Sequence, residues 1–317
     1  MNLLAEIGDA KSVAIAGHIR PDGDCISSTL AVRAYLLNAK PDLKVTVFMQ
    51  ENPPTIFSYL TGYDSMNFTY SPKEEYDVFI ALDASSLDRL GEAYWFFTEA
   101  GKTICVDHHE TNSGLADVNE IDPKACSTCE VLYGTFDKKY INDAVAECLF
   151  SGIVHDSGVF QYSNMGKKSF HIVGELIEYD FDGSKIIRET FYEKSYVQNQ
   201  ILGRALLESI LFMDGRCIVS MVDRKMMEFY NVLPKHLDGI VNQLKNTRGV
   251  EVAIFMYEMD TQRYKVSMRS NGLVNVARIA MVYGGGGHER AAGVEMNGTY
   301  YDIINALSEQ IAKQLML

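Results

Sequence analysis

Short apolar runs alternate with amphipathic stretches along the first third of the chain. The runs at residues 13–17, 45–49, 78–83 and 103–107 are rich in valine and isoleucine, which is typical of parallel strands buried on both faces. Helical patterns at 26–38 and 90–100 lie between the first two runs and between the last two. This order predicts an α/β fold with a doubly wound, mainly parallel sheet.

The rest of the chain predicts more helix and then a second, smaller domain. Residues 128–180 have a mainly helical pattern, and residues 186–212 are polar and helix-prone, which suits a helical linker. Strand patterns follow at 217–222, 250–257 and 264–269, with helical patterns near 236–245, 275–282 and 300–316. We therefore expect a first domain over 1–185, the linker over 186–212 and a smaller α/β domain over 213–317.

Composition and the N-terminal residues narrow the class of protein. The chain has 317 residues, 47% of them hydrophobic, so it is long enough for two domains and too apolar to be disordered. Its opening, MNLLAEIGDAKSV, has acidic residues where a signal peptide has a basic start, and no apolar run is long enough to span a bilayer. We predict a cytoplasmic protein with no membrane partner.

Cysteine usage agrees with a reducing compartment. The six cysteines lie mostly in apolar or helical segments, which favours reduced core residues over a disulfide framework. Cys126 and Cys129 have the spacing of half a zinc site, but no second Cys/His pair has a matching spacing. Ser127 followed by Glu130 instead predicts a capping box at the start of a helix.

The formal net charge of −13 limits the partners. Proteins that bind duplex nucleic acid obtain much of their affinity from lysine and arginine side chains that neutralise phosphates. A broad nucleic-acid surface is therefore disfavoured. A small anionic ligand is compatible with this charge if metal ions or a few cationic groups offset the field locally.

Ionisable side chains gather where the predicted strands of the first domain end. Loops beyond the carboxyl ends of parallel strands converge on one crevice, so residues far apart in the sequence can share a site. The residues concerned are His18, Asp22 and Asp24 after the first strand, Asp83 and then Asp107, His108 and His109 after two later strands, and Asp156 after a helical run.

This cluster favours a metal site over isolated structural roles. Three ionisable residues within seven positions would repel or desolvate one another without a positive charge. Carboxylates and imidazoles without an obvious thiolate favour manganese or magnesium over structural zinc. A central Asp83 would bridge two ions, which is the usual apparatus for displacement at phosphorus. Considered by itself, HIRPDGD is also compatible with a structural turn, and Asp83 by itself with the cap of the next helix.

Four motifs carry a family resemblance. In chain order, HIRPDGD, ALDAS, DHHETN and GIVHDSG resemble the motifs of the DHH phosphoesterase superfamily, and the resemblance covers almost the whole chain. Near the C-terminus, VSMRSNGLVNVARIA followed by YGGGGHERAAG resembles the DHH-associated substrate domain. The arrangement is most similar to the nanoRNase/pAp phosphatase group, which also includes hydrolases of linear and cyclic dinucleotides.

The resemblance implies a centre of two divalent ions, with manganese favoured. One ion would be held by His18, Asp22 and Asp83, and the other by Asp24, Asp83, His108 and Asp156. Asp107 would fix a histidine ring, and His109 would face the substrate to stabilise phosphoryl oxygens or protonate the leaving group. Where the family commonly has alanine, this chain has Cys25, which we expect to change packing and to make the enzyme oxidation-sensitive.

The glycine run near the C-terminus has two interpretations. Consecutive glycines let backbone N–H groups converge on an anion, whereas a glycine run by itself is typical of a flexible turn before the strand AAGVEM. The family resemblance favours a role in binding substrate phosphate. The residues that it implies are Arg269, Ser270, Asn275, Gly285, Gly286, Gly287, His288 and Arg290.

The resemblance therefore implies a manganese-dependent phosphoesterase acting on short oligoribonucleotides or small nucleotides such as pAp. We expect no long duplex as substrate, and the prediction leaves room for a homodimer. The alternatives are a phosphodiesterase for pApA or cyclic di-AMP and a nucleotide sensor without catalysis. Two other members of the superfamily fit less well. A pyrophosphatase should lack the GGGGH motif that this chain has. A RecJ-like exonuclease would need further domains and a basic channel, and neither is apparent from the length and charge of this chain.

Overall fold

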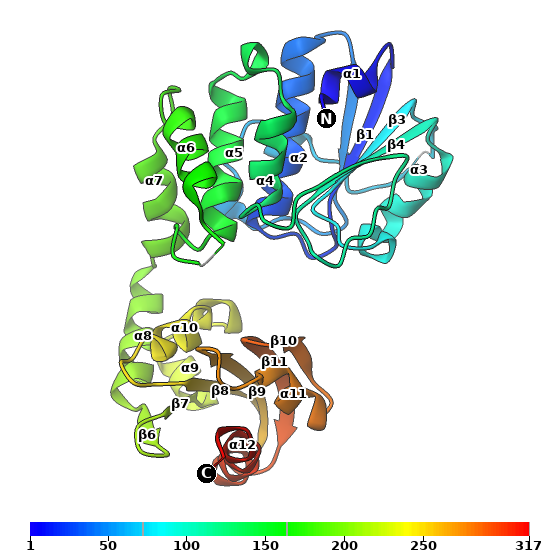
Figure 1. Ribbon diagram of the computed structural model, residues 1–317. Coiled ribbons are helices and arrows are strands. Elements are labelled where there is room, and N and C mark those ends of the chain that lie inside the picture. The colour runs from blue at the N-terminus through cyan, green and yellow to red at the C-terminus, as the bar shows by residue number, and fades with distance from the viewer. Residues whose placement is uncertain (72, 163, 317) are drawn as a thin grey trace. The chain divides into compact units, whose positions relative to one another are not determined.

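The computed structural model describes residues 1–71, 73–162 and 164–316, which form two compact units, Met1–Glu193 and Lys194–Leu317 (Figure 1). The predicted linker divides between them. Its first part includes the π-helix η5 (Arg188–Tyr192) of the first unit, and its later part includes α8 (Tyr196–Leu207) of the second. Because α8 buries Ile201 and Ala205 in an apolar cluster of the second unit, it is part of that unit's core.

The first unit is built on a five-stranded, fully parallel sheet with the strand order β2-β1-β3-β4-β5. The strands are β1 (Ser12–Ala16), β2 (Lys44–Phe48), β3 (Val78–Leu82), β4 (Lys102–Asp107) and β5 (Val118–Ile121). The four predicted strands are present. The fifth, β5, was not predicted because its sequence VNEI is short and only partly buried, so it lacks an apolar run.

Alternate side chains of each strand pack against opposite layers of helices. On β1, Val13 and Ile15 enter the larger core with α2, α4 and α5, whereas Ala14 and Ala16 enter a smaller core with α3. Helices therefore cover both faces of the sheet, which confirms the doubly wound fold (Figure 1). The α-helices are α1 (Leu3–Ile7), α2 (Gly23–Ala39), α3 (Tyr94–Glu99), α4 (Thr128–Thr135), α5 (Asp143–Asp156), α6 (Lys167–Leu176) and α7 (Gly183–Ile187). Short 3-10 helices are η1 (Thr55–Phe57), η2 (Tyr63–Ser65), η3 (Leu87–Ala93) and η4 (Lys138–Tyr140).

Helix α2 begins earlier than its apolar pattern predicted, and this places two candidate ligands. Asp22 is the N-cap, and its Oδ1 accepts hydrogen bonds from the backbone N–H groups of Asp24 and Cys25, both at 3.1 Å. Asp24 therefore lies in the first helical turn. Both carboxylates stand at the N-terminus of a helix, where the backbone dipole favours negative charge.

The second unit is a smaller α/β domain, as predicted. Its six-stranded sheet has the order β10-β11-β9-β8-β7-β6, in which only β7 and β8 pair in parallel. Separate apolar cores lie on its two faces, one with α11 and α12 and the other with α8 and α10. The strands are β6 (Ile210–Phe212), β7 (Cys217–Val222), β8 (Val252–Asp260), β9 (Arg263–Ser270), β10 (Gly286–His288) and β11 (Ala291–Asn297). The helices, besides α8, are α9 (Arg224–Phe229), η6 (Pro234–Leu237), α10 (Ile240–Lys245), α11 (Val276–Val282) and α12 (Tyr300–Leu315).

The last two glycines of the run, Gly286 and Gly287, belong to the edge strand β10 instead of a flexible turn. Gly285 and Gly287 lie so close to β11 that a Cβ atom on either would stand 2.4 Å from a backbone oxygen, of Gly293 and Ala291 respectively. Only glycine permits this approach. The run is therefore partly explained by strand packing.

Candidate active site

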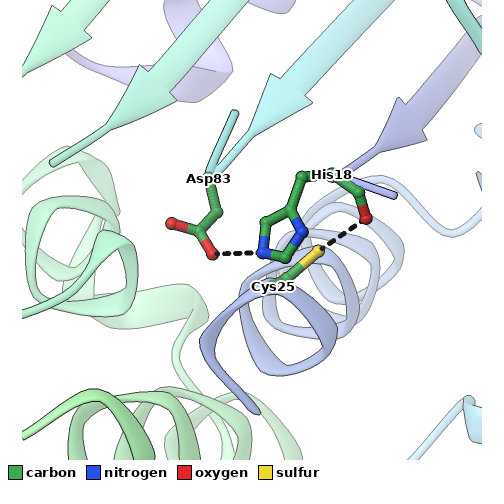
Figure 2. Close-up of side chains that lie close together, drawn as sticks. All are labelled: His18, Cys25 and Asp83. Atoms are coloured by element: carbon green, nitrogen blue, oxygen red, sulfur yellow. Dashed lines mark hydrogen bonds and ion pairs between the residues drawn. The ribbon is translucent and has the colours of Figure 1, made fainter. Parts of the chain in front are cut away.

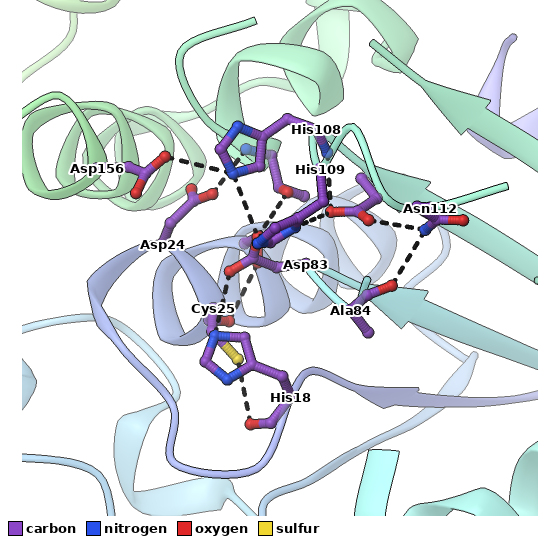
Figure 3. A network of polar contacts seen from close by, with 12 residues as sticks. His18, Asp24, Cys25, Asp83, Ala84, His108, His109, Asn112 and Asp156 are labelled. Atoms are coloured by element: carbon purple, nitrogen blue, oxygen red, sulfur yellow. Dashed lines mark hydrogen bonds and ion pairs between the residues drawn. The ribbon is translucent and has the colours of Figure 1, made fainter. Parts of the chain in front are cut away.

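The predicted ligands of the first unit meet at the carboxyl end of its sheet (Figure 3). His18 follows β1, Asp83 follows β3, and His108 follows β4. Asp24 comes from the start of α2 and Asp156 from the last turn of α5. The topology thus joins residues that are spread over nearly the first half of the chain, as expected for strands that end at one edge.

Asp83 is the centre of this cluster. Its Oδ2 lies 3.5 Å from His18 Nε2, and its Oδ1 lies 3.7 Å from His108 Nε2. The residue is 2% exposed, and its backbone is in the left-handed region with φ of 55°. Such a conformation is uncommon outside glycine, asparagine and aspartate, and it often marks a functional position. The two carboxylate oxygens therefore face two different histidines.

His18 directs one ring nitrogen, Nε2, at the Asp83 carboxylate (Figure 2). Its other ring nitrogen, Nδ1, faces the backbone. Its Nε2 is 3.7 Å from Asp22 Oδ1, and its Nδ1 is 2.8 Å from the Ile19 carbonyl oxygen. Burial lowers the pKa of His18, but its hydrogen bonds with Asp22 and Asp83 outweigh burial and raise the pKa to about 10. The imidazole thus stands in a strongly negative field.

Cys25 lies beside the same histidine. Its thiol Sγ is 3.7 Å from the His18 carbonyl oxygen, and it is completely buried. A Cβ atom on Gly17 would come within 2.2 Å of this sulfur, so the larger side chain at position 25 is accommodated by the glycine at the end of β1. Burial and the charge of Asp83 raise the pKa of the Cys25 thiol well above its usual value.

Asp24 is held by the start of a different helix. Its Oδ2 accepts a hydrogen bond from the Thr128 N–H at 2.6 Å, and its Oδ1 accepts one from the Cys129 N–H at 3.1 Å. Burial, followed by the charges of Asp83 and Asp156, raises the pKa of Asp24 well above its usual value. The first turn of α4 therefore positions this carboxylate against its neighbours.

His108 and Asp156 form the opposite side of the cluster. His108 Nε2 lies 3.3 Å from Asp156 Oδ2, and His108 Nδ1 lies 3.4 Å from the Ala125 carbonyl oxygen. Burial raises the pKa of Asp156 to about 7, against the attraction of His108. Like His18, His108 turns Nε2 toward the carboxylates and Nδ1 toward a backbone acceptor.

Asp107 holds the second histidine of the DHH sequence. Its Oδ1 is 2.7 Å from His109 Nδ1 and also accepts the His108 N–H at 2.8 Å, while its Oδ2 accepts a hydrogen bond from Asn112 Nδ2 at 2.7 Å. Asp107 is completely buried, whereas the His109 side chain is 40% exposed. The hydrogen bond with Asp107 raises the pKa of His109, although burial opposes it.

These residues fit divalent cations. Donor atoms of Asp24, His108 and Asp156 all lie within 4.8 Å of one another, as do those of the set Asp83, His108 and His109 and those of the set His18, Cys25 and Asp83. Burial is the main cause of the raised pKa values of Asp24 and Asp156, and the charge of Asp83 adds to it. A cation offsets both the burial of these charges and their repulsion. Both inward-facing histidines present Nε2 while a backbone carbonyl orients Nδ1, which is the usual arrangement of a metal ligand.

Three supporting residues were not predicted from the sequence. The Thr128 hydroxyl donates a hydrogen bond to Asp83 Oδ1 at 3.0 Å, and Asn112 joins Asp107 to the Ala84 carbonyl oxygen at 3.1 Å (Figure 3). The guanidinium of Arg89 lies 3.0 Å from His18 Nδ1. Their position was the only signal in the sequence. Thr128 begins a helix, and Asn112 follows the DHH sequence, where residues that hydrogen-bond to metal ligands are often found.

The CSTC segment serves the site through its backbone. Ser127 caps α4 by accepting the Glu130 N–H at 3.1 Å, as predicted. The reciprocal bond differs from a capping box, because Glu130 Oε2 accepts the N–H of Cys126, at 3.2 Å, instead of that of Ser127.

The predicted substrate residues lie in the second unit and have different surroundings. Ser270 is buried and donates to Glu251 Oε1 at 2.9 Å, and Asn275 caps α11 by accepting the Arg278 N–H at 3.0 Å. Arg269 is partly buried and donates from Nε to Asn242 Oδ1 at 3.0 Å. The exposed residues of the set are Gly286, Gly287, His288 and Arg290, and within the described ranges the structure gives no hydrogen bond to the side chain of His288 or of Arg290.

Two family models match the chain. The DHH family N-terminal domain matches residues 12–153, and the DHHA1 domain matches residues 214–315. The first match contains every predicted metal ligand except Asp156, and the second contains every predicted substrate residue.

Relatives and a solved structure match over nearly the full length. The bifunctional oligoribonuclease and PAP phosphatase NrnA of Bacillus subtilis is 25% identical over 300 residues, which cover 93% of this chain and 92% of the relative. The protein of the same name from Thermus thermophilus is 25% identical over 323 residues, with coverage of 99% and 95%. An exopolyphosphatase-related protein from Bacteroides fragilis, solved as a crystal structure, has the same fold, with a TM-score of 0.86, 24% identity and coverage of 97% and 94%. Across the described ranges, none of the helices combines the length and apolarity that a membrane span requires.

Proposed function

The chain belongs to the DHH superfamily of phosphoesterases, and from this premise we propose that it hydrolyses short oligoribonucleotides and small nucleotides such as pAp. The observation that carries the proposal is the position of Asp83, whose two oxygens face His18 and His108 at 3.5 and 3.7 Å. The names of the full-length relatives, which combine oligoribonuclease and PAP phosphatase, support the substrate class.

We propose that the cluster holds two divalent ions, with manganese favoured by its oxygen and imidazole ligands. His18, Asp22 and Asp83 would hold one ion. The other would be held by Asp24, Asp83, His108 and Asp156. Such ions supply Lewis-acid neutralisation of charge at phosphoryl oxygens.

The protein's own residues orient the substrate and move a proton. The His109 side chain is 40% exposed and is held by Asp107 at 2.7 Å, so it is placed to donate a proton or a hydrogen bond to a phosphate ester. The hydrogen bond with Asp107 raises its pKa, which keeps the donor form present closer to neutral pH. In this proposal Asp107 is a positioning residue that acts through His109.

The second unit would bind the substrate away from the reacting bond. Arg269, His288 and Arg290 are cationic or polar, and β10 is an edge strand whose outer backbone groups have no strand partner among the described residues. Such donors suit phosphate oxygens. Ser270 and Asn275 would act indirectly, by shaping the loop before α11. A cytoplasmic location and a homodimer stay predictions from the sequence.

The test is a substrate panel with a matched pair of variants. The protein with manganese is incubated with pAp, pApA, an RNA dinucleotide, cyclic di-AMP or pyrophosphate, and released phosphate or mononucleotide is measured. Asp83→Asn removes the central charge but keeps a residue that tolerates the left-handed backbone, and it should reduce turnover by about 10²-fold or more. Asp42→Ala, an exposed carboxylate before β2, should leave turnover unchanged.

The outcomes separate the alternatives. Hydrolysis of pAp and the RNA dinucleotide supports the proposal. If only cyclic di-AMP, or only pyrophosphate, is hydrolysed, the protein has a different substrate from the one proposed. Absence of turnover with every substrate would indicate a nucleotide sensor.

A further inference from the structure

The second unit carries a pocket of about 310 Å³ between one face of its sheet and the segment from η6 to α10. Its polar lining comes from two sources. Tyr257 of β8 and Lys265, Ser267 and Arg269 of β9 form the wall, and Lys235 and Asp238 form the rim. We call this cavity the Tyr257 pocket. Its size is in the range of pockets that bind small organic ligands.

Strand register explains why these side chains share one face. Tyr257 pairs with Lys265 across the two strands, and Phe255 pairs with Ser267. Directly paired residues point to the same face. The alternate residues of β9, Val266 and Met268 among them, are buried in the core with α11 and α12 on the opposite face. The polar residues Lys265, Ser267 and Arg269 of β9 therefore all line the pocket.

Several polar groups of the pocket have no hydrogen-bonding partner in the protein. Across residues 1–71, 73–162 and 164–316, the structure gives no hydrogen bond or ion pair to the Tyr257 hydroxyl, the Ser267 hydroxyl or the Asp238 carboxylate. Asp238 is attracted electrostatically by Lys194, which opposes the rise in its pKa that burial causes. Lys265 has only a distant partner, Glu295, at 3.9 Å. Polar groups that line a cavity without internal partners have their hydrogen-bonding capacity available for a ligand or for water.

Asp238 and Tyr257 lie close enough to influence one another. Burial and then the charge of Asp238 raise the pKa of the Tyr257 hydroxyl. Both side chains line the same pocket. An aromatic ring and a carboxylate in one pocket are suited to a flat ligand that stacks on the ring and donates hydrogen bonds to the carboxylate.

The charges of the pocket point to a phosphorylated ligand. Lys235, Lys265 and Arg269 converge on one cavity in a chain whose net charge is −13. A local cationic group of this kind concentrates anions despite the overall field. A phosphate at the lysine and arginine side chains and a flat base at Tyr257 together describe a nucleotide.

The single carboxylate restricts which base fits. An ionised carboxylate only accepts hydrogen bonds. The Watson–Crick edge of guanine offers two adjacent donors, N1–H and N2–H, whereas that of adenine places the N1 acceptor beside its one amino donor. A carboxylate accepts hydrogen bonds from both donors of guanine, one through each oxygen. Against adenine, one of its oxygens faces the N1 lone pair and is repelled.

We propose that the Tyr257 pocket binds one nucleotide of the substrate and that Asp238 makes it selective for guanine. The proposal rests on the proposed function, because it assigns a substrate preference to the same enzyme. In it, Lys265 and Arg269 contact the phosphate, Tyr257 stacks on the base and Asp238 accepts from the guanine edge.

The first experiment compares kcat/KM of the full-length protein for pGpG, pIpI and pApA with manganese. The wild type should prefer pGpG over pApA by about tenfold or more. Inosine lacks the N2 amino group, so pIpI should be intermediate. Asp238→Asn should remove the preference by lowering kcat/KM for pGpG, with pApA little changed. Glu228→Gln, an exposed carboxylate outside the pocket, should keep the wild-type preference.

A binding measurement separates failure of this proposal from failure of the enzyme proposal. Calorimetric titration with GMP and AMP needs no turnover, and GMP should bind about tenfold more tightly, a difference that Asp238→Asn abolishes. Hydrolysis of bis(p-nitrophenyl) phosphate, which has no base, reports the metal centre alone. If that ester is hydrolysed but neither assay distinguishes guanine from adenine, or if Asp238→Asn keeps the preference, the guanine proposal is wrong. If GMP binds selectively but no ester is hydrolysed, the enzyme proposal fails instead.

Discussion

The Thr128 hydroxyl donates a hydrogen bond to Asp83 Oδ1 at 3.0 Å and so joins the start of α4 to the carboxylate at the end of β3. The backbone N–H of the same residue donates to Asp24 Oδ2 at 2.6 Å. One residue thus orients two carboxylates that come from different elements. Hydrogen bonds of this kind hold metal ligands in a productive direction before the metal binds.

Replacing Thr128 should weaken metal binding without unfolding the protein. Thr128→Val keeps the shape and the backbone N–H but removes the hydrogen bond to Asp83, so affinity for manganese should fall by about 10–100-fold. Isothermal titration calorimetry measures this directly. Thr135→Val is the matched control, because Thr135 is also a buried residue of α4 but donates only to the Leu132 carbonyl oxygen. Equal affinities for the two variants would contradict the role assigned to Thr128.

Gly152 is expected to be essential for the packing of the cluster. A Cβ atom at this position of α5 would stand 2.6 Å from Asp24 Oδ1 and 2.2 Å from Cys129 Sγ. Gly152→Ala should therefore destabilise the fold by about 1–3 kcal/mol and reduce manganese affinity. Gly134→Ala in α4, where a Cβ atom meets no atom within 4 Å, should be neutral or stabilising by up to about 1 kcal/mol. Chemical denaturation measures both, and a stable Gly152→Ala that binds metal normally would refute the expectation.

The pH dependence of turnover should report the pair formed by Asp107 and His109. The hydrogen bond with Asp107 raises the pKa of His109. If protonated His109 is the donor, the rate falls as the pH rises through this pKa, and removing the charge in Asp107→Asn lowers the pKa. The descending limb of the pH–rate profile at saturating manganese should therefore move to lower pH. An unmoved limb together with a normal fold would exclude His109 as the titrating donor.

Removal of metal should destabilise the folded protein. Without cations, Asp24, Asp83 and Asp156 face one another in a buried cluster. A ligand at 100 times its dissociation constant stabilises the native state by about 2.7 kcal/mol per site. Thermal unfolding should therefore occur at a lower temperature with a chelator than with excess manganese, and Asp83→Asn should lose most of that difference. Identical unfolding temperatures for the wild type under both conditions would argue against a metal centre.

The sequence predicted the framework of the first unit because its strands are uninterrupted apolar runs. Parallel topology then brings His18, Asp83 and His108 to one edge, so their proximity followed from where the strands end. Strand β5 was not predicted because VNEI is short and none of its four residues is fully buried. Strand β10 was not predicted because it has only three residues, two of them glycines, and so shows no alternation of apolar and polar side chains.

The hydrogen bonds of Thr128 and Asn112 were not predicted, and the physical reason differs from that for the missed strands. Thr128 donates to Asp83, which is 45 positions away, and Asn112 joins Asp107 to Ala84, which is 28 positions away from Asn112. No local pattern encodes such distances. Ser270 and Asn275 illustrate the opposite case. They fall within a family motif, yet the structure gives their side chains internal partners, Glu251 and the Arg278 N–H.

Anomalous scattering at the manganese edge, from crystals grown with manganese, is the most direct test of the proposed two-metal centre around Asp83. Two peaks about 3.5–4 Å apart are expected, both within bonding distance of the Asp83 carboxylate, with one beside His18 and the other beside His108. No peak at saturating manganese, or peaks that leave Asp83 without a metal, would contradict it.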